Sequence, residues 1–185
     1  MRIALLVVAA LLTAGCTTAV EGPPPAPTGV VLPPRPREVR LEGVDPCSLL
    51  TAEQRAALGF TSEPHFSVSR VELFHGDVPT CTVHSQGSSS AVVGVGLVTT
   101  VGMERWLDPG LNAQTRVVDV AAFPGVITVP ISSKSYCGVE VDVAAGQLLD
   151  VQVLDGGSTP PIPQTSLCDR ALDSAIAAMQ TLTAR

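Results

Sequence analysis

Cysteine is the residue type in this sequence with the most varied chemistry. Four of the five cysteines are Cys47, Cys81, Cys137 and Cys168, which are far apart along the chain. None of them belongs to a Cys-x-x-Cys pair, which argues against a zinc site or a thioredoxin-type redox centre. In an exported protein such cysteines form disulfides, and four of them allow three connectivities. We predict Cys47–Cys168, because both lie at helix starts, and Cys81–Cys137, because both face inward from strands.

The residue types that commonly catalyse reactions form no recognisable set here. His65, His75 and His84 stand neither in a helical pair nor beside an acidic cluster, which argues against a metal site. A Gly-x-Ser-x-Gly motif is absent, and Lys134 has Ile131 rather than serine three residues before it. We therefore expect no catalytic residue, no metal and no cofactor, and we expect the protein not to be an enzyme.

The single tryptophan, Trp106, lies near Met103 and Leu107 in a segment that looks like a loop. If this trio is exposed, it is a possible contact site for a partner. The alternative, which is the more common arrangement, is a satellite cluster packed beneath the loop. Replacing Trp106 with alanine should lower the melting temperature clearly only in the second case.

The first residues have the layout of an export signal peptide, predicted over 1–15. Arg2 precedes an apolar run that has about half of the ~20 residues needed to span a bilayer. Residues 12–16 resemble a bacterial lipobox, in which a cysteine receives the lipid and becomes the new N-terminus. This implies that Cys16 carries acyl chains such as palmitate and holds an extracytoplasmic protein at the cell membrane. The alternative is an ordinary secretory signal in which Cys16 has no role.

Proline dominates the next segment, because residues 17–46 hold eight of the sixteen prolines. Such a sequence favours extended polyproline II structure, which rises about 3.1 Å per residue. We predict that residues 16–43 form the lipidated cysteine and a stalk that carries a disulfide-stapled domain at 44–185. A Pro-rich recognition motif around residues 33–37 is the alternative.

Composition limits the partners of this domain. With 11 Lys+Arg and 17 Asp+Glu the net charge is −6, so a basic surface for nucleic acid is not expected. A hydrophobic content of 45% suits one compact domain with appended segments.

The domain begins with a helix signal and continues with strand signals. Thr51 and Gln54 form a capping box, and Gly59 ends the short helix that follows. Between residues 65 and 155 the apolar residues recur mostly with period two, which is typical of antiparallel strands. The apolar residues change from even-numbered to odd-numbered positions part-way along the first strand signal, which predicts a bulge near Arg70.

The clearest strand signal covers residues 137–143. Its cysteine and valines are predicted to face inward, and Glu140 and Asp142 to face water. A turn at Ala145 and Gly146 then predicts a hairpin with the following strand. In an earlier strand, the pair Gly94 and Gly96 indicates close strand packing or a bulge rather than a phosphate-binding loop.

A last helix is predicted from a capping signal at Ser166 and Asp169 and from an apolar stripe that follows it. The expected fold class is α+β. An antiparallel β-sheet has a short N-terminal helix and a C-terminal helix packed on one face, two disulfides, and a second face exposed to water.

The run Asp45-Pro46-Cys47-Ser48-Leu49-Leu50-Thr51, followed by a short helix, resembles the opening of an actinobacterial lipoprotein family. That family is known only as a domain of unknown function, number thirty-five fifty-eight. The similarity extends in order along the domain through Cys81 at a strand start, residues 123–126, Cys137 in a strand and Cys168 before an Ala-rich helix. Membership implies a lipid-anchored envelope protein and supplies no catalytic residues.

The sequence therefore favours a non-enzymatic, lipid-anchored protein of the cell envelope. Its expected partners are the membrane, through the lipid, and another envelope protein or a cell-wall component. One alternative is a carrier that holds an apolar small molecule between sheet and helices, and a cavity would favour it. A less favoured alternative is an undetected hydrolase.

Overall fold

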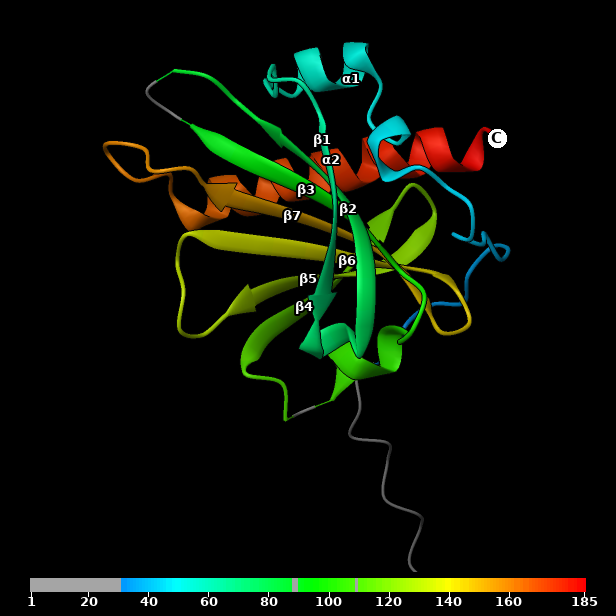
Figure 1. The fold of residues 1–185 in the computed structure, drawn as a ribbon. Helices are drawn as coiled ribbons and strands as arrows, with labels where there is room; N and C mark the ends of the chain where they lie inside the picture. Colours follow the sequence, from blue (N-terminus) through cyan, green and yellow to red (C-terminus); the bar gives the residue numbers. More distant parts are fainter. Residues whose placement is uncertain (1–30, 88–89, 109) are drawn as a thin grey trace, which may run out of the picture.

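A seven-stranded antiparallel sheet organises the chain in the computed structural model (Figure 1). The structure describes residues 31–87, 90–108 and 110–185. The predicted signal peptide, Cys16 and the predicted stalk up to residue 30 lie outside the described residues. The strand order is β1-β2-β3-β7-β6-β5-β4, and each neighbouring pair is antiparallel, as the alternating pattern predicted.

The strands agree with the sequence pattern most closely in the hairpin of β6 and β7. The predicted turn there is confirmed, and Gly146 takes the left-handed backbone conformation (φ 69°) that glycine adopts most easily. The bounds of the strands are β1 (His65–Val71), β2 (Gly76–His84), β3 (Ala91–Val98), β4 (Ala113–Val120), β5 (Phe123–Pro130), β6 (Tyr136–Ala144) and β7 (Gln147–Asp155).

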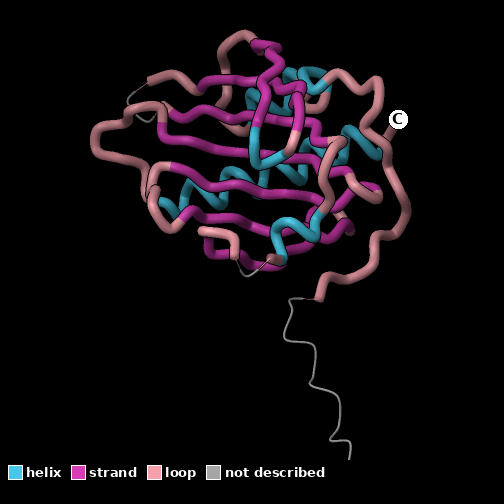
Figure 2. The backbone as a smooth tube through the Cα atoms, turned by 60° about the horizontal axis from the view of Figure 1, so that its bottom comes forward, coloured by secondary structure: helices cyan, strands magenta, loops and turns pink. Residues whose placement is uncertain are grey.

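Both α-helices pack on the same side of the sheet, so the predicted α+β fold is confirmed. They are α1 (Ala52–Ala57) and α2 (Gln164–Thr183), and shorter 3-10 turns are η1 (Pro46–Ser48), η2 (Glu72–Phe74) and η3 (Met103–Leu107). The long helix α2 lies against β6 and β7, behind the strands in Figure 2. Gln54 of α1 joins the two helices by donating to the carbonyl of Ala177 (3.0 Å). Within the described residues, no helix is both long and apolar enough to span a membrane.

Of the two helix caps predicted from the sequence, one is confirmed and the other is wrong. Thr51 accepts from the backbone N–H of Gln54, and Gln54 accepts from that of Thr51, so the predicted capping box is confirmed. The predicted cap at Ser166 is wrong, because α2 already begins at Gln164. The Gln164 side chain donates to the carbonyls of Ser133 and Tyr136 (both 3.1 Å), which fixes this helix start against the beginning of β6 and the loop before it.

The main core fills the space between the sheet and the helices. The inward valines of β6 are fully buried there, as predicted, together with alternate residues of β3 and β7 and the apolar stripe of α2. Phe60, just after α1, is also buried, and the guanidinium of Arg170 lies 4.6 Å from its ring centre. Apolar burial on this face is the main source of stability.

The disulfides are Cys47–Cys81 and Cys137–Cys168, so the predicted pairing is wrong although all four cysteines are paired. Strands β3 and β7 separate β2 from β6. This separation places Cys81 and Cys137 about 14 Å apart, at about 4.8 Å per strand, whereas a disulfide needs Cα atoms within about 7 Å. Each bond instead joins a strand to the helical segment that covers it, η1 on β2 and α2 on β6.

The predicted bulge near Arg70 is also wrong. β1 pairs with β2 in one unbroken register from His65 to Val71. The apolar positions change because Phe66 and Val68 lie on one face of β1 and stay exposed, whereas Val71 lies on the other face and packs near Phe74. The chain then leaves the sheet at η2, after which His75 takes a left-handed conformation (φ 55°).

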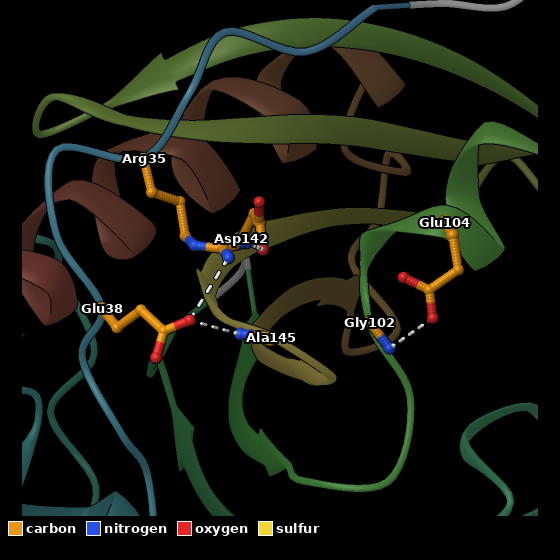
Figure 3. Close-up of polar contacts among 6 residues, drawn as sticks. All are labelled: Arg35, Glu38, Gly102, Glu104, Asp142 and Ala145. Atoms are coloured by element: carbon orange, nitrogen blue, oxygen red, sulfur yellow. Dashed lines mark hydrogen bonds and ion pairs between the residues drawn. The ribbon is translucent and has the colours of Figure 1, made fainter.

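The last part of the predicted stalk lies against the domain. In this segment, residues 35–43, which we call the strap, Arg35 pairs with Asp142 of β6 (2.5 Å) and lies beside Glu38 (Figure 3). The backbone N–H of Val39 donates to the carbonyl of Val143 (2.8 Å), and Leu41 is 2% exposed. The domain therefore begins before the predicted residue 44. The predicted start of the domain is too late, because the apolar residues of the strap follow the proline cluster and the prediction assigns them to the stalk with it.

Candidate ligand-binding site

The face of the sheet opposite α2 is partly covered. The turns η2 and η3 follow β1 and β3 and lie in front of the strands in Figure 2. The rings of Phe74 and Trp106 stack there, with centroids 5.5 Å apart. A second cluster of buried side chains results, formed by Phe74, Val78, Val98, Met103, Trp106, Val126 and Leu148. The prediction that this face is exposed to water is therefore wrong at its centre.

Trp106 is 1% exposed, and Met103 is also buried. Leu107 packs against the same cluster and is partly buried. The structure thus places the trio in a satellite cluster beneath the loop and does not present it as an exposed contact site for a macromolecule.

Two carboxyl groups are buried on this face. Glu140 of β6 and Asp150 of β7 are 2% and 4% exposed, although Glu140 was predicted to face water. They are partners in the antiparallel register, which brings side chains to the same face with Cβ atoms about 5 Å apart. The side chain of Trp106 also hydrogen-bonds to Glu140. A strand pattern tells which face a residue is on, but it does not tell what covers that face.

Each carboxyl group has a polar partner but no cation. The Thr128 hydroxyl donates to Oε2 of Glu140 (2.5 Å), and the Gln152 amide donates to Oδ2 of Asp150 (2.7 Å). The other oxygen of Asp150, Oδ1, is buried without a hydrogen-bond partner among the described residues. No ion pair within the described part of the chain includes Glu140 or Asp150. A buried carboxylate in such surroundings is energetically costly.

The pKa values of the pair reflect this cost. Burial, and then the charge of Asp150, raises the pKa of Glu140 well above its usual value, against the hydrogen bonds from Thr128 and Trp106. Burial also raises the pKa of Asp150, to about 7, against the hydrogen bond from Gln152. The pKa of the Tyr136 phenol is raised by burial and by the same two carboxyl groups. Neighbouring carboxyl groups resist double ionisation, so their proximity adds to the effect of burial and favours a protonated form of the pair.

Two glycines leave the space that these side chains occupy. A Cβ atom on Gly96 would stand 3.2 Å from Oδ2 of Asp150. One on Gly138 would stand 2.8 Å from the hydroxyl of Tyr136 and 2.9 Å from Oε1 of Glu140. The prediction of close packing at the Gly94 and Gly96 pair is confirmed for Gly96.

A cavity of about 480 Å³ opens beside Glu140. We call it the sheet-face cavity. Leu73 at its edge is 37% exposed, so solvent reaches it. The lining from η2 and η3 is apolar, and the strands and loops contribute both apolar and polar residues: Val71, Leu73, Phe74, Trp106, Leu111, Asn112, Ala113, Thr128, Pro130, Ser133, Tyr136, Glu140 and Gln152. Small-molecule sites commonly have this composition and volumes of about 300–1,000 Å³.

Other candidate residues lie elsewhere. His65 begins β1, His75 follows η2 and His84 ends β2, and all three are exposed. A second hollow of about 400 Å³ lies between α2 and β4, but Arg116 and Asp169 in its lining are exposed. The sheet-face cavity is therefore the stronger candidate, because buried acids and buried aromatic rings meet there.

Sequence reasoning missed the carboxyl pair for a specific reason. A regular hairpin through the turn at Ala145 would place Glu140 opposite Val151. A register shift between Asp142 and Ala144 places it opposite Asp150 instead. Acidic residues at alternating positions of both strands were a visible signal, but their juxtaposition depended on that shift.

One known protein family matches the chain. Its description is "Protein of unknown function (DUF3558)", and the match covers residues 11–181. The chain therefore belongs to this family, which confirms the resemblance noted from the sequence. No curated protein and no solved structure matches.

Proposed function

We propose that this domain binds a small molecule with a largely apolar body in the sheet-face cavity. The observation that carries the proposal is the cavity itself, with apolar walls, a volume of about 480 Å³ and a few polar groups at one side. Polar groups in such a site orient the ligand, and apolar walls supply the affinity. This is the carrier hypothesis at a different location, because the main core occupies the space between sheet and helices.

We further propose that the domain acts outside the cytoplasm, held at the cell membrane by lipid on Cys16. The signal-like residues before Cys16 support this proposal, as do two disulfides, which are typical of oxidising compartments. The N-terminal peptide of the protein from its own host should carry acyl mass, and Cys16→Ser should lose that mass and leave the membrane fraction. An unmodified Cys16 would contradict the anchor and leave the cavity proposal standing.

Binding of decanol tests the cavity proposal. Trp106 is the only tryptophan and lines the cavity, so its fluorescence should change saturably with decanol. Ala113→Phe should fill part of the cavity and weaken binding by at least about tenfold, or about 1.4 kcal/mol. Ala57→Phe, on the exposed side of α1, is the matched control and should bind like the wild type. No saturable binding, or equal binding by Ala113→Phe, would contradict the proposal.

Docking of another envelope component is the second candidate function. The observation in its favour is that Phe66 and Val68 on edge strand β1 are each 53% exposed. Phe66→Ser/Val68→Ser should then lose a partner that cross-links to the wild type in native membranes, with decanol binding unchanged.

A hydrolase is the remaining alternative. A buried acid with a raised pKa, such as Glu140, is also a feature of active sites. Turnover of generic esters or peptides that is lost in Glu140→Gln would favour an enzyme over a binding protein.

A further inference from the structure

The lining of the sheet-face cavity includes one acid, Glu140, and no base. Glu140 lines the cavity, and Asp150 lies beside it on the neighbouring strand. Both are more than nine-tenths buried, and Oδ1 of Asp150 lacks a hydrogen-bond partner within the described residues. An unsatisfied buried acceptor in a native fold calls for an explanation, and a bound donor is one.

The neighbours of Glu140 supply hydrogen bonds but no positive charge. Thr128 of β5 and Trp106 of η3 donate to it, and Asp150 of β7 repels it. Of the charged residues of η3, Glu104 accepts from the backbone of Gly102, and Arg105 donates through one Nη atom to Asp108, while its Nε is buried without a partner among the described residues. No ion pair in the described part of the chain joins Arg105 to Glu140 or Asp150. A cation would therefore have to come from a ligand.

The apolar walls also suit a cation. Phe74 and Trp106 line the cavity with their rings. Aromatic faces attract ammonium groups, and the attraction is stronger when the groups are desolvated. Carboxyl groups and aromatic rings together are a common way to hold a protonated amine.

We propose that the ligand ends in a protonated amine, which binds at Glu140, beside Asp150, while its apolar body fills the sheet-face cavity. This inference rests on the proposed function and adds the chemical class of the ligand. An alcohol would gain a hydrogen bond but no ionic attraction, and a carboxylate would be repelled by any charge on the pair.

Proton balance distinguishes the three ligand classes. Burial and mutual repulsion favour a protonated form of the carboxyl pair before an amine binds. When an ammonium group binds, it keeps its own protons, and the carboxyl pair gives its proton to solvent. Amine binding should therefore release a proton and strengthen as pH rises, until the amine itself loses its charge. Alcohol binding should exchange no proton, and carboxylate binding should take one up.

Decylamine, decanol and decanoate form a matched set of probes for this inference. Titration calorimetry in two buffers of different ionisation enthalpy measures the protons exchanged. At pH 8 we expect decylamine to bind at least about tenfold more tightly than decanol, which is about 1.4 kcal/mol. We expect release of up to one proton with decylamine and tight binding of decanoate only at low pH.

Single substitutions test which side chains cause the preference for decylamine over decanol. Glu140→Gln keeps the shape of the side chain and should abolish the preference for decylamine, so that decylamine binds no more tightly than decanol. Asp150→Asn should act in the same direction. Glu53→Gln makes the same chemical change on the exposed side of α1 and should change nothing. Decanol binding by each variant shows that the cavity is still folded.

The possible results distinguish the inference of an amine ligand from the proposed function on which it rests. If none of the three probes binds, the proposed function itself fails. If decanol binds as well as decylamine and Glu140→Gln changes neither, the amine inference fails while the cavity proposal stands. A preference for decanoate would overturn the inference in the same way.

Discussion

Several acidic residues of this domain have a structural role at the level of single hydrogen bonds. Asp45 caps η1, Asp119 accepts from the backbone of Ala122, and Asp155 accepts from three backbone N–H groups after β7. Glu140 and Asp150 differ, because they stabilise no turn and no helix end. For this reason we assign the pair to a ligand rather than to the fold.

The carboxyl pair predicts that stability falls as pH rises. A carboxyl group whose pKa is higher in the folded protein contributes most below its unfolded pKa, and this contribution is lost as pH rises through the folded pKa. For Asp150 the window runs from about 4 to about 7, and the raised pKa of Glu140 acts in the same direction. Urea unfolding at pH 5 and pH 8 measures the difference.

A variant in which amides replace both carboxyl groups provides the comparison with the wild type. Glu140→Gln/Asp150→Asn should remove this part of the pH dependence and exceed the wild type in stability at pH 8 by about 1–4 kcal/mol, since one unit of pKa shift corresponds to about 1.4 kcal/mol. Parallel pH profiles for the wild type and the double variant would show that the pair is ionised in the folded protein, against this account.

The packing of the Trp106 ring can also be tested by a single substitution. Because it is buried and stacked on Phe74, Trp106→Ala should destabilise the protein by about 3–5 kcal/mol. Thermal melting followed by circular dichroism checks this. An unchanged melting temperature would mean that the ring is not packed in the cluster, and it would revive the exposed contact site.

At the scale of elements, each disulfide fastens one helical segment to one strand. The bonded cysteines are 34 and 31 residues apart in sequence, so the chain-entropy estimate is nearly the same for both, about 3–4 kcal/mol. Cys137→Ala/Cys168→Ala should therefore lose about this much stability in urea unfolding. Peptide mapping without reduction should link Cys47 to Cys81, and a Cys47–Cys168 peptide would contradict the fold described here.

The contribution of the strap to stability can be tested in the same way. Leu41 is buried in the main core and its N–H donates to the Gln147 side chain (2.9 Å). Leu41→Ala should cost about 2–5 kcal/mol in urea unfolding. Val31, which precedes the strap and is 77% exposed, provides the control, because Val31→Ala should change nothing. Equal stability of both variants would mean that the strap does not pack in solution.

Local patterns predicted the elements better than their contacts. The capping box at Thr51, the strand from Cys137 and the turn at Gly146 depend on neighbouring residues, and all three predictions are correct. The disulfide pairing and the burial of Glu140 depend on strand order, on a register shift and on what covers a face. No local pattern carries that information, because such contacts join residues far apart in the sequence.

At the scale of the whole molecule, the two faces of the sheet are built differently. On one face the helices and sheet enclose the main core, and on the other the turns η2 and η3 leave the sheet-face cavity beside Glu140. The strap crosses the end of the β6–β7 hairpin, where Glu38 accepts weakly from the N–H of Ala145 (3.4 Å; Figure 3). This arrangement fixes where a tether at the N-terminus would leave the domain.

The most direct test of the central claim is native mass spectrometry of the protein extracted gently from its own host's membranes. Our account predicts a non-covalent adduct of small-molecule mass on the wild type, reduced in Ala113→Phe and retained in Ala57→Phe. An adduct that fragments as an amine would also support the inference drawn from Glu140 and Asp150. A wild-type protein that carries no adduct, and that also fails to bind decanol or decylamine when they are added, would contradict the account.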